Sequence, residues 1–165
     1  MNKMLGNMEG WLDKATTFAK EKNGFDANVL LTLRLAPDQY ELVKQIQSAC
    51  DSAKFAAARL SRKEPPKHPD TETTMEQIRA RIAEVRKYLS GFKESDFANA
   101  DDVIVPLPWM PGKAAKGSVY LHEMSSTNFY FHLVHTYAIL RNAGVNLGKM
   151  DFMGQSPLLD AKDVL

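Results

Sequence analysis

Cysteine and long apolar runs are both scarce in this chain of 165 residues. The one cysteine, Cys50, cannot form an internal disulfide bond, which indicates a reducing compartment. No uninterrupted apolar run approaches the ~18 residues of a membrane span. Near the start, Glu9 and Asp13 stand where a signal peptide has its apolar core. We therefore expect a cytoplasmic protein that has no membrane partner.

A surplus of one charge is absent as well. Lys and Arg number 21 and Asp and Glu number 20, so the net charge is +1. This balance provides no basic surface that would attract nucleic acid. The chain also has no internal repeat and no low-complexity segment. Its length is typical of one domain with a real core, and we treat residues 1–165 as a single domain.

Apolar residues recur at steps of three and four along four segments, and each segment predicts an amphipathic helix. The third segment, from Met75 to Phe92, follows this period without a break, and we expect its charged residues, Arg81 among them, to form a solvated face. We expect the first helix to end at Asn23-Gly24 and the second to span residues 37–60, with Pro37 in its first turn. A capping box formed by Thr73 and Glu76 is expected to start the third helix. The fourth helix is expected to begin at Ser125 or Ser126 and to end at Gly144.

Residues 93–124 differ in character from the helical segments. The stretches "DDVIVPLPW" and "GSVYLHEM" are β-prone and are separated by "MPGKAAKG", which predicts a short β-hairpin or extended insertion. The tail after Gly144 is predicted to be a loop anchored by Phe152. The order of the elements predicts an all-α fold, a four-helix bundle with one insertion before its last helix.

Several catalytic motifs are incomplete in this sequence. "GKAAKGS" has the glycine spacing of a phosphate loop, but Ser118 stands where the loop needs lysine. "HEMSS" starts like a zinc-protease helix but lacks the second histidine. Cys50 falls on the apolar stripe of the second helix, so we expect a small core residue there and not a nucleophile.

The fourth helix carries the residues of greatest functional interest. In "NFYFHLVHTYAILRNAGV", Asn128 and His132 are four apart, and His132 and His135 are three apart. Residues at both spacings are neighbours on a helix surface. Two imidazoles so placed can share a metal ion if a facing helix supplies a third ligand. Alternatively, each ring forms hydrogen bonds with neighbours in a packed bundle.

Four stretches resemble a known family. They are "MLGNMEGWLDKA", "LTLRLAPDQYELVKQIQSACDSAKFAAARL", "DTETTMEQIRARI" and "NFYFHLVHTYAILRNAGVNLGKMDFMG". Together they resemble the domain-of-unknown-function family DUF1993, which is placed with the DinB/YfiT-like helical bundles. The resemblance covers nearly the whole chain, and "AILRNAGV" followed by "LGKMDFMG" is its most specific part. Because the chain starts inside the family's first helix, we expect a short N-terminal leader to be absent.

The resemblance implies a four-helix bundle that is often a homodimer. Better-known members of the superfamily, thiol-dependent transferases and isomerases, bind a divalent metal through three histidines. One histidine comes from the second helix and two lie four apart on the last helix. In this sequence His132 matches the second of that pair, Asn128 stands at the first, and the position on the second helix falls at Ser48 or within a turn of it.

Asn and Ser are poor ligands for zinc or nickel, so we expect no metal cofactor. Asp51 lies opposite the apolar stripe, so we expect it at the surface. The main hypothesis is an uncharacterised DinB-like protein whose degenerate metal site is a pocket for an unknown small molecule. One alternative is an enzyme of the thiol-transferase type with Zn or Ni held by His132 and Asn128. Another is a non-catalytic homodimer with a structural or interaction role. The expected pocket residues are His132, Asn128, Ser48, Cys50, Tyr137 and His135, with Phe129, Tyr130 and Tyr137 as walls.

Overall fold

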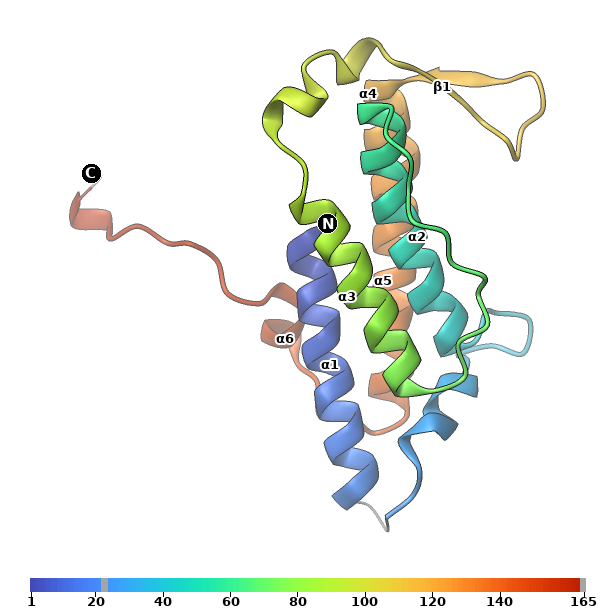
Figure 1. Cartoon of the computed structure of the whole chain (residues 1–165). Helices are drawn as coiled ribbons and strands as arrows, with labels where there is room; N and C mark the ends of the chain where they lie inside the picture. Colours follow the sequence, from blue (N-terminus) through green and yellow to red (C-terminus); the bar gives the residue numbers. More distant parts are fainter. Residues whose placement is uncertain (22–23, 164–165) are drawn as a thin grey trace.

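Four long helices form a bundle in the computed structural model, which describes residues 1–21 and 24–163. They are α1 (Asn2–Glu21), α2 (Leu42–Ser61), α3 (Met75–Ser90) and α5 (Ser126–Asn142). In Figure 1, α1 and α5 run downward, whereas α2 and α3 run upward. Helix α2 packs against α5 and α3, and α1 packs against α3 and α5. The predicted four-helix bundle is confirmed.

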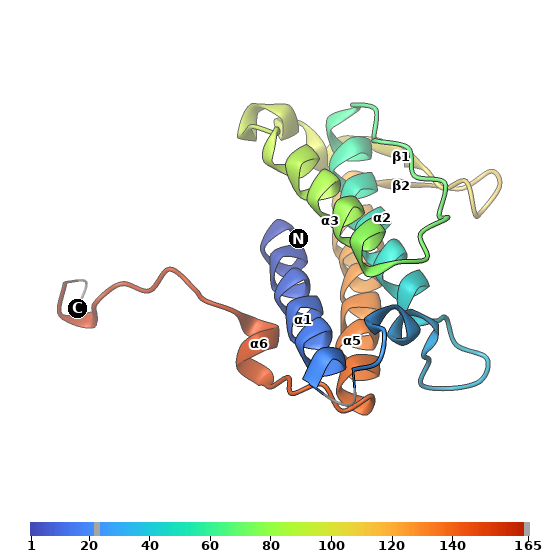
Figure 2. The ribbon, with the colours of Figure 1, turned by 60° about the horizontal axis from the view of Figure 1, so that its bottom comes forward.

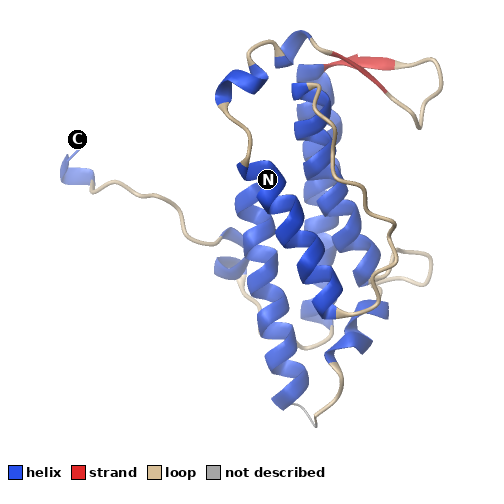
Figure 3. Cartoon of the chain, in the orientation of Figure 1, coloured by secondary structure: helices blue, strands red, loops and turns tan. Residues whose placement is uncertain are grey.

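The remaining elements are short (Figure 3). Residues 62–74 connect the parallel helices α2 and α3 and pass back along the outside of the bundle (Figures 1 and 2). The predicted insertion is a two-stranded antiparallel hairpin in which Val105 pairs with Ala115. The short elements are η1 (Ala27–Thr32), η2 (Glu94–Phe97), η3 (Ala100–Asp102), β1 (Ile104–Pro106), β2 (Ala114–Lys116), α4 (Gly117–Val119), η4 (Tyr120–Ser125), α6 (Lys149–Met153) and η5 (Ala161–Asp163).

The ends of the first two helices differ from their predicted positions. Helix α1 ends at Glu21; the predicted terminal residue Asn23 lies outside the described residues, and Gly24 has φ +61°. Helix α2 begins at Leu42, so the prediction that Pro37 lies in its first turn was wrong. The Leu42 amide donates to the Leu33 carbonyl at 2.8 Å, which closes a loop over the intervening residues. That loop uses Pro37 in a turn.

A capping box does start α3, but one residue later than predicted. The Thr74 hydroxyl accepts a hydrogen bond from the Gln77 amide at 3.2 Å. In return, Gln77 Oε1 accepts from the backbone N–H groups of Thr74 and Thr73, at 3.1 and 2.7 Å. Because the returning side chain is Gln77, the box is Thr74–Gln77 and not Thr73–Glu76.

The last helical run is longer than the sequence predicted. "GSVYLHEM" is not a strand, because it forms α4 and the π-helical segment η4, which continue into α5. Consequently, neither Ser125 nor Ser126 caps the start of this run. A Cβ atom at Gly117 would lie 1.8 Å from the Ala100 carbonyl oxygen. Glycine is therefore needed where the run leaves β2, since any side chain would collide with η3.

Two separate hydrophobic clusters hold the structure together. The larger one fills the bundle and contains Cys50, which is 0% exposed, so its prediction as a core residue is confirmed. Phe152 stacks on Trp11 of α1 with ring centroids 5.4 Å apart, which confirms the predicted anchor. The tail around it is not all loop as predicted, because Lys149–Met153 form the short helix α6. The smaller cluster joins the hairpin to the end of α2 and consists of Leu60, Val103, Val105, Leu107 and Tyr120.

In Figure 2, residues 154–163, which follow α6, extend away from the bundle on the side opposite the hairpin. Within residues 1–21 and 24–163, no helix combines the length and the apolar character needed to cross a membrane.

Candidate functional site

A pocket of about 770 Å³ lies between α2 and α5, with the hairpin at one end. Helix α2 contributes Ser48, Asp51, Ser52, Phe55 and Arg59, and the two halves of the last helical run contribute most of the opposite wall. The tip of the hairpin adds an aromatic ring. The other lining residues are Tyr40, Trp109, Tyr120, Met124, Ser125, Thr127, Asn128, Phe131 and His132.

His132 is fixed at the pocket by two hydrogen bonds in series. Its Nδ1 lies 2.7 Å from Oε1 of Gln45, and the Gln45 amide nitrogen donates to the Tyr40 carbonyl at 3.3 Å. Because an amide oxygen only accepts, Nδ1 must carry the proton. The Nε2 atom then has a free lone pair, and no partner for it is found among the described residues. This nitrogen can accept a hydrogen bond from a ligand.

The imidazole of His132 is uncharged at neutral pH. Burial lowers its pKa to about 4, and electrostatic interactions with His135 and Lys44 lower it further. The residue is 7% exposed, and its ring stacks against Tyr40 with centroids 6.4 Å apart. A neutral ring with one fixed N–H and one free acceptor is suited to accept a hydrogen bond from a ligand.

One turn before the histidine, hydroxyl and amide groups form a chain of hydrogen bonds between α5 and α2. The Asn128 amide nitrogen donates to Ser52 Oγ at 2.8 Å, and that hydroxyl donates to the Ser48 carbonyl at 2.8 Å. From the last helical run, Ser125 Oγ donates to the Ser52 carbonyl at 3.1 Å. The orientation of Asn128 is thereby fixed, with its nitrogen used internally and its oxygen left as an acceptor.

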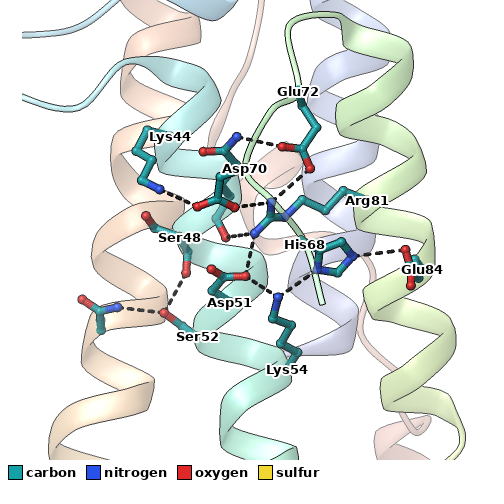
Figure 4. A network of polar contacts seen from close by, with 12 residues as sticks. Lys44, Ser48, Asp51, Ser52, Lys54, His68, Asp70, Glu72, Arg81 and Glu84 are labelled. Carbon is teal, nitrogen blue, oxygen red and sulfur yellow. Dashed lines mark hydrogen bonds and ion pairs between the residues drawn. The ribbon is translucent and has the colours of Figure 1, made fainter. Parts of the chain in front are cut away.

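Behind α2, a buried arginine collects three carboxylates (Figure 4). Arg81 of α3 is 2% exposed, so the prediction that it belongs to a solvated face was wrong. Its guanidinium contacts Asp51 at 2.6 Å, Asp70 at 2.5 Å and Glu72 at 3.0 Å. Burial alone would raise the pKa values of Asp70 and Glu72, but hydrogen bonds from Arg81 and other partners keep both below their usual values.

A second buried cation extends this network along α2. Lys54 is 2% exposed and contacts Asp51 at 2.7 Å, while its Nζ donates to His68 Nδ1 at 2.8 Å. His68 Nε2 lies 3.1 Å from Glu84, so this imidazole carries its proton on Nε2. Asp51 is therefore half-buried and paired with two cations, although it also lines the pocket. Its predicted position at the surface was wrong for this reason.

At the hairpin end of the pocket, Arg59 lies among aromatic rings. Its guanidinium carbon is 5.0 Å from the ring centroid of Phe55, 5.2 Å from Trp109 and 5.4 Å from Tyr120. Nη1 also donates to the Tyr120 hydroxyl at 2.8 Å. The pocket therefore has a cationic, aromatic end and a polar end near His132.

Comparison with known proteins identifies the family. Residues 1–153 match the family model described as "Domain of unknown function (DUF1993)". The chain belongs to the DUF1993 family. It is also similar to a crystal structure described as a DinB family member protein from Shewanella denitrificans, with a TM-score of 0.92 and 45% sequence identity over 96% of this chain and 90% of that one. No curated protein matches.

In this DUF1993 protein, the side chains at the expected ligand positions do not fit a divalent cation. Asn128 directs its nitrogen to Ser52, which lies one turn after Ser48, and the Ser52 hydroxyl is committed to a carbonyl. Only Nε2 of His132 offers a strong donor there. Within the described part of the chain, no group of three or more His, Cys, Asp or Glu side chains is arranged so that it could hold a metal ion. The expectation that no metal binds stays a prediction.

The structure brings three of the six expected pocket residues of this DUF1993 protein to the cavity: His132, Asn128 and Ser48. The other three lie elsewhere. Cys50 is buried in the bundle core, where burial raises the pKa of its thiol to about 12. His135 contacts the Phe131 carbonyl at 2.7 Å and Gln39 at 3.3 Å, outside the cavity lining. Tyr137 packs edge-on against Trp11 on another side of α5.

The walls also differ from the expected ones. Phe129 is 0% exposed and belongs to the core, and Tyr130 does not line the cavity. Sequence reasoning missed Arg59 and Trp109, whose meeting depends on how the hairpin folds against α2. A weak signal existed for Arg59, because Phe55 stands four residues before it on the same helix.

Proposed function

We propose that this protein binds a small molecule in the pocket between α2 and α5, without the three-histidine metal site of better-known DinB-like proteins. The observation that carries the proposal is the state of His132. Its ring is neutral and oriented by Gln45, and its Nε2 has no partner among the described residues although it borders a pocket of about 770 Å³. Pockets of this size are typical of small-molecule sites.

Filling the pocket tests the proposal. Fragments that bind the wild-type protein are first identified by ligand-observed NMR. Asn128→Trp places an indole in the cavity, and Asn142→Trp is the matched control because Asn142 is exposed at the far end of α5. We expect bound fragments to lose their signal with Asn128→Trp and to keep it with Asn142→Trp. Equal binding to both variants would overturn the proposal.

A metal-dependent enzyme of the thiol-transferase type is the competing function. Elemental analysis of protein purified without an affinity tag distinguishes the two. Our proposal predicts that zinc and nickel stay far below one ion per chain after incubation with either metal and dialysis. A stoichiometric metal that disappears in His132→Ala would replace our proposal with the enzyme.

We further propose that the protein works as a cytoplasmic homodimer. The single, buried Cys50 suits a reducing compartment. One face of α5 exposes large apolar side chains, with Tyr130 at 47%, Phe131 at 53% and Val134 at 49%, which supports pairing of that face with a second copy. Light scattering after size exclusion should give a dimer that Val134→Asp dissociates. Met150→Asp, on the exposed surface of α6, is the control that should leave the dimer intact. A monomeric wild-type protein would refute this part.

A further inference from the structure

Arg59 differs from the other cations of the described residues because it lines the pocket and has no carboxylate partner there. A guanidinium has five N–H donors. In the described structure, one of them is used, by the Tyr120 hydroxyl. The rings of Phe55, Trp109 and Tyr120 stabilise the cation by cation–π contact but accept no in-plane hydrogen bond.

The surroundings favour an anion as the missing partner. Aromatic rings near the guanidinium lower the local dielectric and so strengthen a charge-assisted hydrogen bond at its free edge. Among the described residues, the one carboxylate that lines the pocket does not cancel the charge of Arg59. That carboxylate, Asp51, already pairs with Arg81 at 2.6 Å and Lys54 at 2.7 Å. A ligand that brings its own anionic group would therefore complete this end of the pocket.

The opposite end of the pocket, near His132, offers hydrogen-bond acceptors instead of a cation. Nε2 of His132 accepts hydrogen bonds, and the Asn128 oxygen is a second acceptor. Gln45, which orients His132, precedes Arg59 by almost four turns of α2, which corresponds to roughly 20 Å of helix. An elongated molecule can therefore reach both ends, with its anion at Arg59 and a hydroxyl or amine donor near His132.

We infer that the ligand is an organic anion, a carboxylate or phosphate ester, with a flat apolar group next to its charged end. Arg59 holds the anionic group, and Trp109 and Phe55 contact the flat group. This inference rests on the proposed function, because it names the ligand class of the same pocket. It assigns Arg59 as the residue that selects charged over uncharged ligands.

Matched pairs of ligands test this assignment. One pair is 4-phenylbutyrate with its uncharged analogue 4-phenylbutyramide, and the other is 4-phenylbutyl phosphate with 4-phenylbutanol. Dissociation constants are measured by NMR titration. We expect the wild-type protein to bind the charged member of at least one pair roughly tenfold more tightly, because a hydrogen bond to a charged group contributes about that factor. The pair with the larger ratio identifies the anion as carboxylate or phosphate.

Variants separate ligand selection from a structural role. Arg59→Gln should reduce the ratio of charged to uncharged affinity to about one, Arg59→Lys should keep part of it, and Arg141→Gln, at the far end of α5, should keep all of it. Added salt should weaken only the charged ligand. If Arg59 merely fastens the hairpin through Trp109, both members of a pair lose affinity equally and the ratio is unchanged. That result would overturn the inference.

Failure of the inference can be told apart from failure of the proposed function. If charged and uncharged members bind the wild-type protein equally and Asn128→Trp abolishes both, the pocket binds ligands but has no preference for anions. The same conclusion holds if only neutral fragments bind to the wild-type protein and Asn128→Trp abolishes their binding. If nothing binds to the wild-type pocket, the proposed function fails and the inference fails with it.

Discussion

The buried, neutral His132 predicts a specific loss of stability in mild acid. In the folded protein burial holds the pKa of the imidazole at about 4, whereas the ordinary value is 6.5. Between these two values the unfolded chain binds more protons than the folded one, so the free energy of unfolding falls as the pH is lowered. The contribution of His132 is complete above pH 6.5 and is lost progressively on the way down to about pH 4.

The magnitude follows from the width of that interval. A change of one pKa unit corresponds to about 1.36 kcal/mol. Lowering the pKa of His132 from 6.5 to about 4 therefore contributes roughly 3 kcal/mol to the pH dependence of the free energy of unfolding. Against a typical total stability of about 5–15 kcal/mol, this loss is readily measured. The dependence should be steepest near the middle of the interval, where it approaches about 1.4 kcal/mol per pH unit.

Urea denaturation at a series of pH values between 7 and 4 measures this dependence. His132→Asn is the informative variant, because its amide nitrogen can still donate to Gln45 but it cannot take up a proton. We expect the variant to lose most of the pH dependence that the wild-type protein shows in this interval. His122→Asn, which is exposed and outside the cavity lining, should retain it. If His132→Asn and the wild-type protein have parallel curves, the imidazole is not the buried neutral group that we describe.

Two further substitutions test the packing around the site. Arg81→Leu leaves three carboxylates without their shared cation and should cost roughly 3–5 kcal/mol of unfolding free energy, whereas Arg79→Leu, which removes an exposed ion pair on the same helix, should cost less than about 1 kcal/mol. Equal costs in urea denaturation would contradict the buried network. Gly117→Ala should destabilise by roughly 1–3 kcal/mol because its Cβ meets the Ala100 carbonyl at 1.8 Å, whereas Gly10→Ala, with open space around it, should be neutral or stabilising. A thermal melt in which both alanine variants behave alike would refute the close approach.

Much of the fold was predictable because it depends on local periodicity. The four helices follow from apolar residues at steps of three and four, and Cys50 fell on the buried stripe of α2. The ends of the helices were predicted wrongly where hydrogen bonds to residues outside the helix determine where it begins. Leu42 begins α2 because its amide bonds to Leu33. The β-prone "GSVYLHEM" is helical because it continues into α5, and its tertiary position outweighs its intrinsic preference.

The site was predictable only in part, because its residues meet through tertiary contacts. Asn128 and His132 share a helix face, so their proximity followed from spacing alone. Arg81 was misassigned because charged residues are usually exposed, although it stands three residues after Ile78 and four before Val85, on the apolar stripe. Its carboxylate partners come from another helix and from the loop that precedes α3, and single-sequence patterns do not show such pairings.

The division of the interior into two hydrophobic clusters has a consequence for how this protein can change. Trp109 and Tyr120, which shape one end of the pocket, belong to the hairpin insertion and its junction with the last helix, whose small cluster is distinct from the bundle's main core. Exchanging the tip of the insertion should therefore alter which molecules fit while the bundle keeps its melting behaviour. Substitutions in the insertion can therefore change ligand preference with little effect on the stability of the bundle. The reason is that the insertion and the bundle are stabilised by different sets of side chains.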